Sequence, residues 1–539
     1  MNTEIVELLK AAGPTIAEIG RVSGAPGISV AIAHDGQMIH EVHFGYRDLQ
    51  TQDAPDTNTR YGIGSLTKAF TAAAIGILVD DGKLQYDTPL SHILPDFDHT
   101  DPVVTQQLTI RELLTHTTGL VAANHWWYGA GASLLLEKKD LIPAFNRLEH
   151  VCPVRTHYAY SNWGYAVAGE AIEILSGMSY GEFLKARVFE PLDMHETSVN
   201  SALASESQMA KPYTVLDDGK FYRLPLPPSN DGTIMAAAQG IISTTADMLK
   251  FSTALLAAQK AELDSPNGPS HPLLKNVARQ LTFHVLTTPA SLLERSYGYG
   301  FHRIQLPNPF AGLECNSMFV QRMPTLAANA NSTLAITHPG SLAGYTSALT
   351  LLPELNMSLI VFTNSIGFGD PADWINQLLV ETLVAGRSSN DYIAMAEEAK
   401  RSHIQRFQDM ELTFDDARMS ATLNRPMEDY IGTYVNQNQM PFKIVIRRKH
   451  NANLQVMFQG LESQAWDLHL CGEDVLDWFC PRDDLAKRAL FTYSGPDLFK
   501  LRFGSDDEGN INRVCWKVDP VVPLKRLCFN KVSDASRDV

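Results

Sequence analysis

A serine and a lysine three residues apart are the first pair in this sequence that could do chemistry. They belong to Ser65-Leu66-Thr67-Lys68, which precedes the apolar run 69–79. At the start of a helix this spacing places a hydroxyl and an amine on one face. Burial in an apolar core lowers the pKa of a lysine, so its neutral amine can accept the serine proton. The pair therefore predicts a nucleophilic serine with its own base, and acyl transfer as the reaction class.

A phenol and a carboxamide follow about a hundred residues later, in Tyr160-Ser161-Asn162. A phenol near the lysine can pass a proton to a leaving group. A carboxamide can donate to the substrate and also hold the lysine. We therefore expect Tyr160 and Asn162 to join Ser65 and Lys68 in one site.

A third segment, His338-Pro339-Gly340-Ser341, is interpreted as a turn that leads into a strand at 348–352. Gly340 lets a substrate approach the backbone closely because it has no side chain. The N–H of Ser341 could then pair with the N–H of Ser65 as an oxyanion hole.

These motifs, in this order, resemble those of the serine β-lactamases of the AmpC type and their penicillin-binding, D-aminopeptidase and esterase relatives (peptidase family S12). The three segments match the family's S-x-x-K, its Y-x-N and the position usually written K-T-G, and the resemblance covers about residues 20–385. It implies that Ser65 is acylated, that Lys68 is its base and that Tyr160 protonates the leaving group. It also implies four substrate-binding residues, which are Asn162, His338, Gly340 and Ser341.

His338 is where this sequence departs from the β-lactamases, which have a lysine at this position. A histidine is only partly charged near neutral pH, and Pro339 supplies neither a hydroxyl nor an N–H. The site is therefore expected to bind a substrate carboxylate poorly and to turn over β-lactams slowly. Histidine here resembles the esterase, transesterase and D-aminopeptidase branches.

Composition excludes several other functions. The 539 residues carry a net charge of −16, and no basic segment could bind nucleic acid or an anionic membrane surface. No apolar run reaches the length of a membrane span, and the N-terminal residues do not resemble a secretory signal, so we expect a cytoplasmic protein. The six scattered cysteines predict free thiols and no zinc site. We also expect that the protein needs no cofactor.

The expected fold class is α+β. Strand patterns at 27–33 and 38–45, before the Ser65 helix, and at 334–337, 348–352 and 359–363, beyond a mostly helical stretch, suggest one sheet built from distant parts of the chain. The resemblance implies an antiparallel sheet flanked by helices plus an all-helical lobe. Short apolar runs after residue 425, among them 454–458 and 490–493, predict a small antiparallel barrel or sandwich, which resembles a lipocalin-like domain. We divide the chain into a catalytic domain at 1–390, a helical connection at 391–423 and a barrel at 424–539.

Three features leave two interpretations each. The cluster His125-Trp126-Trp127-Tyr128 could line an apolar acyl pocket or pack in the core. The segment 306–331 could be a lid or a tolerated insertion. His116 could act in catalysis, but a structural role in its loop is favoured.

The leading hypothesis is a serine hydrolase that acts through acyl-Ser65 on an ester, thioester or amide of a small metabolite or peptide. The first alternative is an acyltransferase, transesterase or peptide cyclase of secondary metabolism, which uses an alcohol or an amine as acceptor. The second is a non-catalytic scaffold or binding protein on the same fold. A homo-oligomer is left open.

Overall fold

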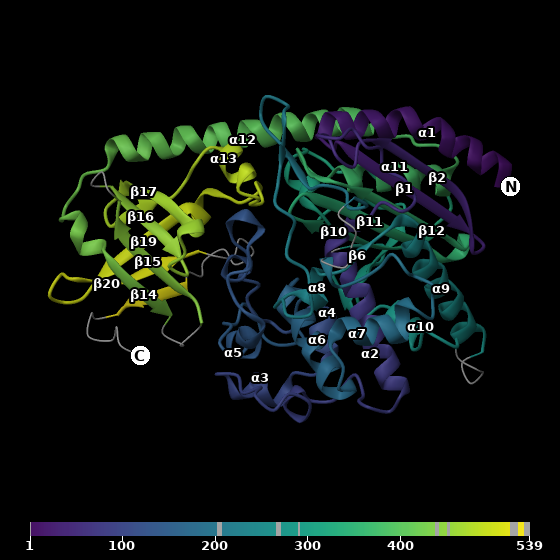
Figure 1. Cartoon of the computed structure of the whole chain (residues 1–539), viewed down its shortest axis with the longest axis horizontal. Helices are drawn as coiled ribbons and strands as arrows, with labels where there is room; N and C mark the ends of the chain where they lie inside the picture. The colour runs from purple at the N-terminus through teal and green to yellow at the C-terminus, as the bar shows by residue number, and fades with distance from the viewer. Residues whose placement is uncertain are drawn as a thin grey trace.

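The computed structural model describes residues 2–201, 207–265, 271–288, 291–436, 441–449, 453–517 and 527–532. Figure 1 shows a large unit of sheet and helices beside a smaller barrel, with the long helix α12 (Tyr392–Ser420) extending over both. This helix lies in the part of the chain where the sequence predicts a helical connection. The domain boundaries themselves stay a prediction.

The large unit is built on an eight-stranded sheet in the order β2-β1-β12-β11-β10-β9-β8-β7, whose neighbouring strands are antiparallel. It joins both ends of this unit, as the sequence predicts, because β1 pairs with β12 across more than 300 residues. The strands are β1 (Gly27–His34), β2 (Gln37–Gly45), β7 (Val285–Leu286), β8 (Arg295–Tyr297), β9 (His302–Leu306), β10 (Thr333–Leu342), β11 (Tyr345–Leu352) and β12 (Met357–Thr363).

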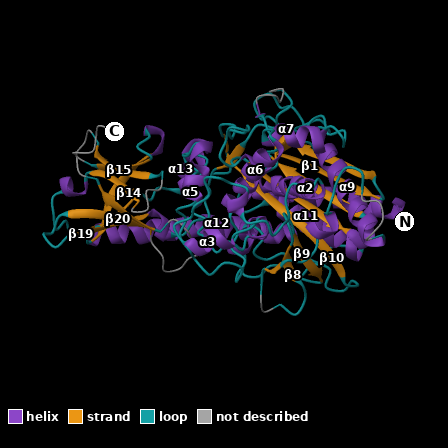
Figure 2. Ribbon diagram, turned by 90° about the horizontal axis from the view of Figure 1, so that it is seen from below, coloured by secondary structure: helices purple, strands orange, loops and turns teal. Residues whose placement is uncertain are grey.

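Helices cover both faces of this sheet (Figure 2). Helices α1 (Asn2–Ser23) and α11 (Pro371–Ala385) pack together on one face, over a core that includes Ile16, Val361 and Trp374. Helix α9 (Thr245–Asp264) packs on β1 and β12 from the other face. Both faces of β1 and β12 are buried, so these strands have nearly continuous apolar sequences.

The helical lobe surrounds α2 (Thr67–Asp80), in which every residue from Thr67 to Leu78 is buried. Its environment is the apolar one that the sequence predicts for the residues after Ser65. The remaining helices are α3 (Pro102–Gln107), α4 (Ile110–Thr115), α5 (Leu141–Phe145), α6 (Asn162–Ser176), α7 (Tyr180–Leu184), α8 (Ala236–Gln239), α10 (Val277–Gln280) and α13 (Arg482–Lys487). Two small sheets pair β3 (Tyr61–Gly62) with β6 (Ile242–Ser243), and β13 (Ser365–Ile366) with β4 (Tyr213–Val215) and β5 (Phe221–Arg223).

The smaller unit is a closed antiparallel barrel, which confirms the prediction of a C-terminal β domain. Its strands are β14 (Gly432–Asn436), β15 (Lys443–Arg448), β16 (Leu454–Phe458), β17 (Ala465–Gly472), β18 (Val475–Asp477), β19 (Lys500–Ser505), β20 (Ile511–Trp516) and β21 (Leu527–Lys531). The prediction of a strand at 490–493 is wrong. Its apolar side chains instead pack outside the barrel, where Phe491 contacts Tyr128 of the large unit with ring centroids 5.3 Å apart.

The expectation that all six cysteines are free is also wrong. Cys515 on β20 and Cys528 on β21 face each other directly in the strand register and form a disulfide. Scattered spacing along the sequence did not indicate this pair because strand register alone brings the two residues together. The other four cysteines are free.

The segment 124–135 of the large unit docks against the barrel. Trp126 is fully buried and stacks on Phe442, with ring centroids 6.2 Å apart. The Gln464 side chain accepts from the N–H of Ala130 at 2.7 Å and donates to its carbonyl at 3.0 Å. Of the two interpretations of the aromatic cluster at 125–128, this contact corresponds to packing.

The segment 306–331 is packed as part of the large unit. Asn316 donates to the Asp373 carboxylate of α11 at 2.8 Å, and Phe319 stacks on His403 of α12 at 4.2 Å. Phe310 and Leu326 are buried. These contacts favour a structural insertion over a lid.

Among the helices in the described ranges, none combines the length and the apolar character that crossing a membrane requires.

Candidate active site

Ser65 lies in a short 3₁₀ turn (Gly64–Leu66) that leads directly into α2. The Lys68 Nζ is 3.0 Å from the Ser65 Oγ, so the predicted spacing does place the amine beside the hydroxyl. Ser65 is partly exposed, whereas Lys68 is fully buried. Burial holds the pKa of Lys68 well below its usual value because an ammonium ion is poorly solvated there.

Two carbonyl groups hold the Lys68 amine in place. It donates to the Asn162 Oδ1 at 2.8 Å and to the backbone carbonyl of Ala238 at 3.0 Å. Asn162 is the first residue of α6, and Ala238 lies in α8, so two helices of the lobe supply these contacts. The Asn162 Nδ2 donates in turn to the Asn124 Oδ1 at 3.2 Å, which fixes the orientation of the amide.

Tyr160 approaches Ser65 from the other side and donates its hydroxyl to the Ser65 Oγ at 2.7 Å. Burial is the largest cause that raises the pKa of Tyr160, while the hydrogen bond to Ser65 lowers it and the charge of Glu314 raises it. The phenol therefore keeps its proton at neutral pH. Ser65, Lys68, Tyr160 and Asn162 are brought together as the sequence predicts.

The backbones of Ser65 and Ser341 also adjoin. A Cβ on Gly340 would lie 3.2 Å from the Ser65 nitrogen and only 2.3 Å from the Ile63 carbonyl oxygen. A Cβ on Gly64, which has a φ of +53°, would lie 2.9 Å from the Ser341 nitrogen. Only glycine fits at these two positions, so the closeness of the two chain segments depends on Gly64 and Gly340.

The segment 338–341 is not the turn that we expected, because it continues strand β10 and pairs with β11. Strand β9 pairs with β10 only over 333–337, so beyond Thr337 the register gives β10 no partner on that side. Pro339 is tolerated there because no N–H is needed at an edge. The freed edge lies directly beside Ser65.

Both ring nitrogens of His338 are engaged inside the protein. Nδ1 lies 2.6 Å from the Pro339 carbonyl, which can only accept, so Nδ1 carries a hydrogen and donates. Nε2 lies 3.1 Å from the Tyr297 hydroxyl and must accept from it. His338 is 1% exposed, and burial holds its pKa well below the usual value.

The same hydroxyl joins His338 to His116. The N–H of Ser161 donates to the His116 Nδ1 at 3.1 Å, so the other nitrogen, Nε2, carries the hydrogen and donates to Tyr297 at 3.3 Å. Burial also holds the pKa of His116 well below the usual value. The chain from Ser161 through His116 and Tyr297 to His338 is therefore a directed network of neutral groups that connects the Tyr160 loop to β10.

The sequence model of the Beta-lactamase family matches residues 15–382, which is most of the chain. The chain belongs to the Beta-lactamase family. The matched range includes every residue of the predicted site.

The curated proteins that are similar in sequence to this chain are named for several different activities. The chain is 33% identical over 253 residues to an unguisins hydrolase of Aspergillus campestris, covering 46% of each chain. It is 31% identical over 238 residues to penicillin-binding protein 4* of Bacillus subtilis, covering 42% of this chain and 51% of that one. It is 25% identical over 281 residues to a D-aminopeptidase of Cereibacter sphaeroides, covering 51% and 49%. The chain thus spans about half the length of the curated relatives that it matches.

Among solved structures, the fold resembles an octameric penicillin-binding protein homologue from Pyrococcus abyssi. The TM-score is 0.55 at 20% identity, and the match covers 97% of this chain and 99% of the other. At this identity the likeness concerns the fold alone, but it extends over the barrel as well as the Beta-lactamase domain.

Three parts of this Beta-lactamase site were missed from the sequence: the Ala238 carbonyl, Asn124 and Tyr297. The first is a backbone group, which no pattern of side chains indicates. The segment Tyr297-Gly298-Tyr299-Gly300-Phe301 does resemble family sequences, and that likeness was the available signal for Tyr297. Within the described ranges, no group of three or more His, Cys, Asp and Glu side chains is arranged to hold a metal ion, and the absence of a cofactor stays a prediction.

Proposed function

We propose that this member of the Beta-lactamase family is a serine hydrolase that acts through an acyl-Ser65 intermediate. One observation carries the proposal: a buried lysine whose contacts orient it toward the hydroxyl of Ser65. The network on Lys68 and Tyr160 supplies both a base and an acid around one partly exposed oxygen.

The hydrogens of Lys68 define the direction of proton transfer. In its neutral form the amine has two hydrogens, and the Asn162 Oδ1 and the Ala238 carbonyl accept both of them. Its lone pair is then left for the Ser65 hydroxyl, 3.0 Å away. The lowered pKa of Lys68 favours this form near neutral pH. Lys68 thus takes the proton as the Ser65 Oγ attacks a carbonyl carbon.

The tetrahedral oxyanion would lie between the N–H groups of Ser65 and Ser341, for which the glycine contacts at 64 and 340 support a close approach. Collapse breaks the bond to the leaving group, and the Tyr160 hydroxyl, which keeps its proton, supplies the proton that this group needs. The released Tyr160 oxygen regains a proton from the Lys68 ammonium, which carries the proton taken from Ser65 and whose nitrogen lies 4.9 Å from the centre of the Tyr160 ring. Water then attacks acyl-Ser65 by the reverse route.

The substrate that we propose is an amide or ester of a small peptide or metabolite, with amides favoured. Two relatives support this choice, since they are named as a D-aminopeptidase and as a hydrolase of unguisins. We assign His338 a positioning role, because a neutral ring with both nitrogens engaged offers no fixed positive charge to a substrate carboxylate. Weak turnover of β-lactams is therefore expected. We also propose that the catalytic domain ends at residue 390 and that the barrel domain begins after residue 423. A cytoplasmic location and assembly into a homo-oligomer are part of the same proposal.

The same acyl-Ser65 could pass to an alcohol or an amine, as in an acyltransferase, transesterase or peptide cyclase. A non-catalytic scaffold would form no acyl-enzyme at all. Formation of acyl-Ser65 therefore separates the acyltransferase from the scaffold.

The test is to react the protein with a fluorophosphonate probe and to locate the adduct by peptide mass spectrometry. We expect labelling at Ser65 that Ser65→Ala abolishes and that Ser91→Ala, a change of an exposed serine, leaves intact. Absence of label at Ser65 in the folded wild type would rule out the hydrolase and favour the scaffold.

A second measurement identifies the substrate and the acceptor. D-amino-acid amides, acyl thioesters and p-nitrophenyl esters are each incubated with and without an added alcohol or amine, and intact mass follows the acyl-enzyme. We expect free acid as the main product in both conditions. A product joined to the added acceptor as the main species would instead identify an acyltransferase.

A further inference from the structure

One loop of the large unit leads from the Lys68 amine to the barrel. Its residue Asn124 accepts from the Asn162 amide at 3.2 Å, and the oxygen of that amide accepts from Lys68. Two residues later, Trp126 is fully buried against the barrel. Residues Asn124–Trp126 form a single 3₁₀ turn. One turn of the chain therefore separates a contact of the active site from a contact of the barrel.

Trp126 lies at one end of the barrel. Its ring stacks on Phe442, which directly precedes β15, and His125 lies against Trp516, the last residue of β20, with ring centroids 6.1 Å apart. Neighbouring strands of an antiparallel barrel run in opposite directions, so the start of β15 and the end of β20 lie at the same end. The mouth of a β-barrel is a common place for a small ligand. Here a tryptophan of the same chain lies there.

Hydrogen bonds fasten the backbone after Trp126 to the same end of the barrel. The Gln464 side chain binds both the N–H and the carbonyl of Ala130. The N–H of Gly131 donates to the Arg488 carbonyl at 2.6 Å. Both partners lie in connections between barrel strands, so the barrel sets the position of this part of the loop.

The loop has a backbone conformation that its own residues do not favour. Ala123, immediately before the turn, has a φ of +37°, and Ala132 has a φ of +57°. Alanine rarely adopts this left-handed region, because its Cβ comes too close to the following carbonyl oxygen. Such a conformation persists where surrounding contacts hold it. The contacts with the barrel lie between these two alanines, so a loop released from the barrel is expected to relax.

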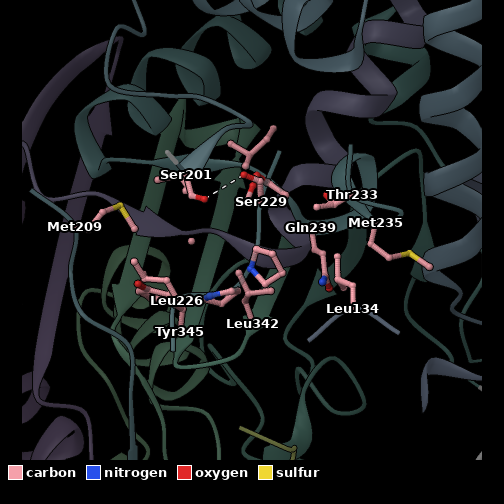
Figure 3. A pocket seen from close by; sticks show the side chains of 16 residues that line it. Leu134, Ser201, Met209, Leu226, Ser229, Thr233, Met235, Gln239, Leu342 and Tyr345 are labelled. Atoms are coloured by element: carbon pink, nitrogen blue, oxygen red, sulfur yellow. Dashed lines mark hydrogen bonds between the residues drawn. The ribbon is translucent and has the colours of Figure 1, made fainter. Parts of the chain in front are cut away.

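The end of the loop approaches the second helix that holds Lys68. Leu134 lines a small pocket together with Met235 and Gln239 (Figure 3). Gln239 is the last residue of α8 and follows Ala238, whose carbonyl accepts from Lys68 at 3.0 Å. The loop that the barrel holds therefore adjoins both groups that hold the amine.

The contact at Asn124 sets the direction of the Asn162 amide. The Asn124 Oδ1 can only accept, so it binds the NH₂ group of Asn162 and leaves the amide oxygen for Lys68. A reversed amide would present its N–H groups to the amine and would compete with the Ser65 hydroxyl for the lone pair. The observed direction keeps that lone pair for Ser65, as the proposed mechanism requires.

We propose that the barrel is a positioning element of the active site and that it acts through Trp126. The barrel holds Trp126 at its end, the 3₁₀ turn passes this restraint to Asn124, and Asn124 keeps the Asn162 amide oxygen on Lys68. The inference deepens the proposed function and rests on it, because Lys68 is the base of that mechanism. Trp126 touches no reacting atom and is a positioning residue.

The test measures the rate of fluorophosphonate labelling at Ser65. Fluoride leaves without a proton, so this rate reports the activation of Ser65 alone. Trp126→Ala and Phe442→Ala remove the stacking contact from its two sides, and each should slow labelling about tenfold or more. Trp126→Phe should recover most of the rate. The Trp126 indole N–H is buried without a partner in the described residues, so ring area and not a polar contact holds this side chain.

The matched control is Phe503→Ala, which also removes a buried ring from the barrel. Phe503 packs on Tyr430 and Tyr434, and its N–H donates to Asp474 in the turn between β17 and β18, at the opposite end. Urea unfolding should show similar losses of stability for Phe442→Ala and Phe503→Ala. Labelling of Phe503→Ala should nevertheless stay within about twofold of the wild type. Equal slowing in both variants would make general destabilisation of the barrel the cause and would overturn the proposal.

A double-mutant cycle tests whether Trp126 acts through Asn124. Asn124→Ala should slow labelling about tenfold, and adding Trp126→Ala should slow it less than about twofold further, because the contact that Trp126 maintains is already lost. A general structural effect of Trp126 would instead multiply the two losses. A double variant that is slower by about a hundredfold would therefore overturn the route through Asn124.

Failure of the proposed function gives a different result. If wild-type Ser65 is not labelled, the hydrolase proposal is wrong and the positioning role falls with it. If the wild type is labelled and both Trp126→Ala and Phe442→Ala react at its rate, the positioning role alone is refuted. Thermal unfolding confirms that each variant is folded. Gln464→Leu, which removes the two bonds to Ala130 at nearly constant volume, takes the place of a variant that does not fold and should also slow labelling.

Discussion

The protein has two buried clusters of aromatic rings, one beside Ser65 and one inside the barrel. The first forms hydrogen bonds that position the site, whereas the second mainly packs the core of the barrel. The site cluster consists of His116, Tyr158, Tyr160, Tyr165, Tyr297, His302 and His338. The barrel cluster consists of Phe442, Phe458, Trp466, Trp478, Phe499 and Trp516. The first is made of rings with polar edges, whereas the second is made of phenylalanine and tryptophan.

The difference lies in what the ring edges do. Near Ser65, a hydroxyl and ring nitrogens form directed hydrogen bonds that reach from the Ser161 N–H, next to Tyr160, through His116 and Tyr297 to β10. In the barrel, Trp516 donates to the Leu498 carbonyl, but the Trp478 indole N–H is buried without a partner in the described residues. The barrel rings thus contribute mainly apolar area and stacking, and the site rings contribute position. In the site cluster, removing a single polar atom should therefore lower activity or stability. In the barrel cluster, removing side-chain volume should lower stability.

The largest effect is expected from Tyr160→Phe. The ring stays, so stability should change little, but the proton donor to the leaving group is gone and kcat/KM should fall by about 10²- to 10⁴-fold. The matched control is Tyr434→Phe, which removes a buried hydroxyl from a barrel tyrosine. Steady-state kinetics on a p-nitrophenyl ester and on an amide give the comparison, and an amide rate within threefold of the wild type would refute the role of Tyr160.

The second effect concerns volume in the barrel. Phe458 is buried and stacks on Trp516 with ring centroids 4.7 Å apart. Phe458→Ala leaves a cavity, so the free energy of unfolding should fall by about 3–5 kcal/mol. Urea unfolding followed by tryptophan fluorescence measures it. A loss below about 1 kcal/mol would mean that the barrel cluster does not carry the packing that we assign to it.

The same contrast explains what could be predicted from the sequence. Ser65, Lys68, Tyr160 and Asn162 belong to short motifs in which local spacing already implies chemistry, and the structure brings all four together. The link from His116 to His338 joins residues more than 200 positions apart through Tyr297. Only strand pairing and the placement of loops create it, so no local pattern could reveal it.

In the barrel, local patterns predicted strands but not their partners. The run 454–458 is β16 with the expected bounds, because this short apolar run with a valine and a phenylalanine has the composition that strands favour. The run 490–493 has a similar apolar texture, yet it packs against the large unit, because apolar residues indicate burial without saying on which surface. The pairing of Cys515 with Cys528 depends on register and was missed for the same reason.

A smaller effect is expected from Tyr297→Phe, which removes one oxygen from the site cluster and no volume. The His116 N–H loses its acceptor and the His338 nitrogen loses its donor, and both groups stay buried. Leaving them unpaired should lower the free energy of unfolding by about 1–3 kcal/mol. Tyr434→Phe leaves only one backbone carbonyl without its donor and should cost less. If urea unfolding shows the same loss of unfolding free energy for Tyr297→Phe and Tyr434→Phe, the hydrogen-bond network of the site cluster does not contribute the additional stability that we assign to it.

The smallest effect is a pH dependence, measured as the difference in unfolding free energy between the wild type and His338→Gln. Burial lowers the pKa of His338 in the folded protein, and the nearby His302 and Lys68 side chains lower it further. Below pH 6.5 the unfolded chain therefore binds a proton at residue 338 that the folded chain does not. The contribution of the neutral His338 ring to the free energy of unfolding is complete above this pH and is lost as the pH falls. Glutamine does not titrate, so only the wild type loses this contribution. The loss of unfolding free energy caused by His338→Gln should therefore become smaller by about 1.4 kcal/mol when the pH is lowered from 7.5 to 5.5. The cost of His157→Gln, a change of an exposed histidine, is the control. A cost of His338→Gln that stays constant or grows with acid would mean that the ring is charged in the folded protein, and the site cluster would then be an ionic network and not a neutral one.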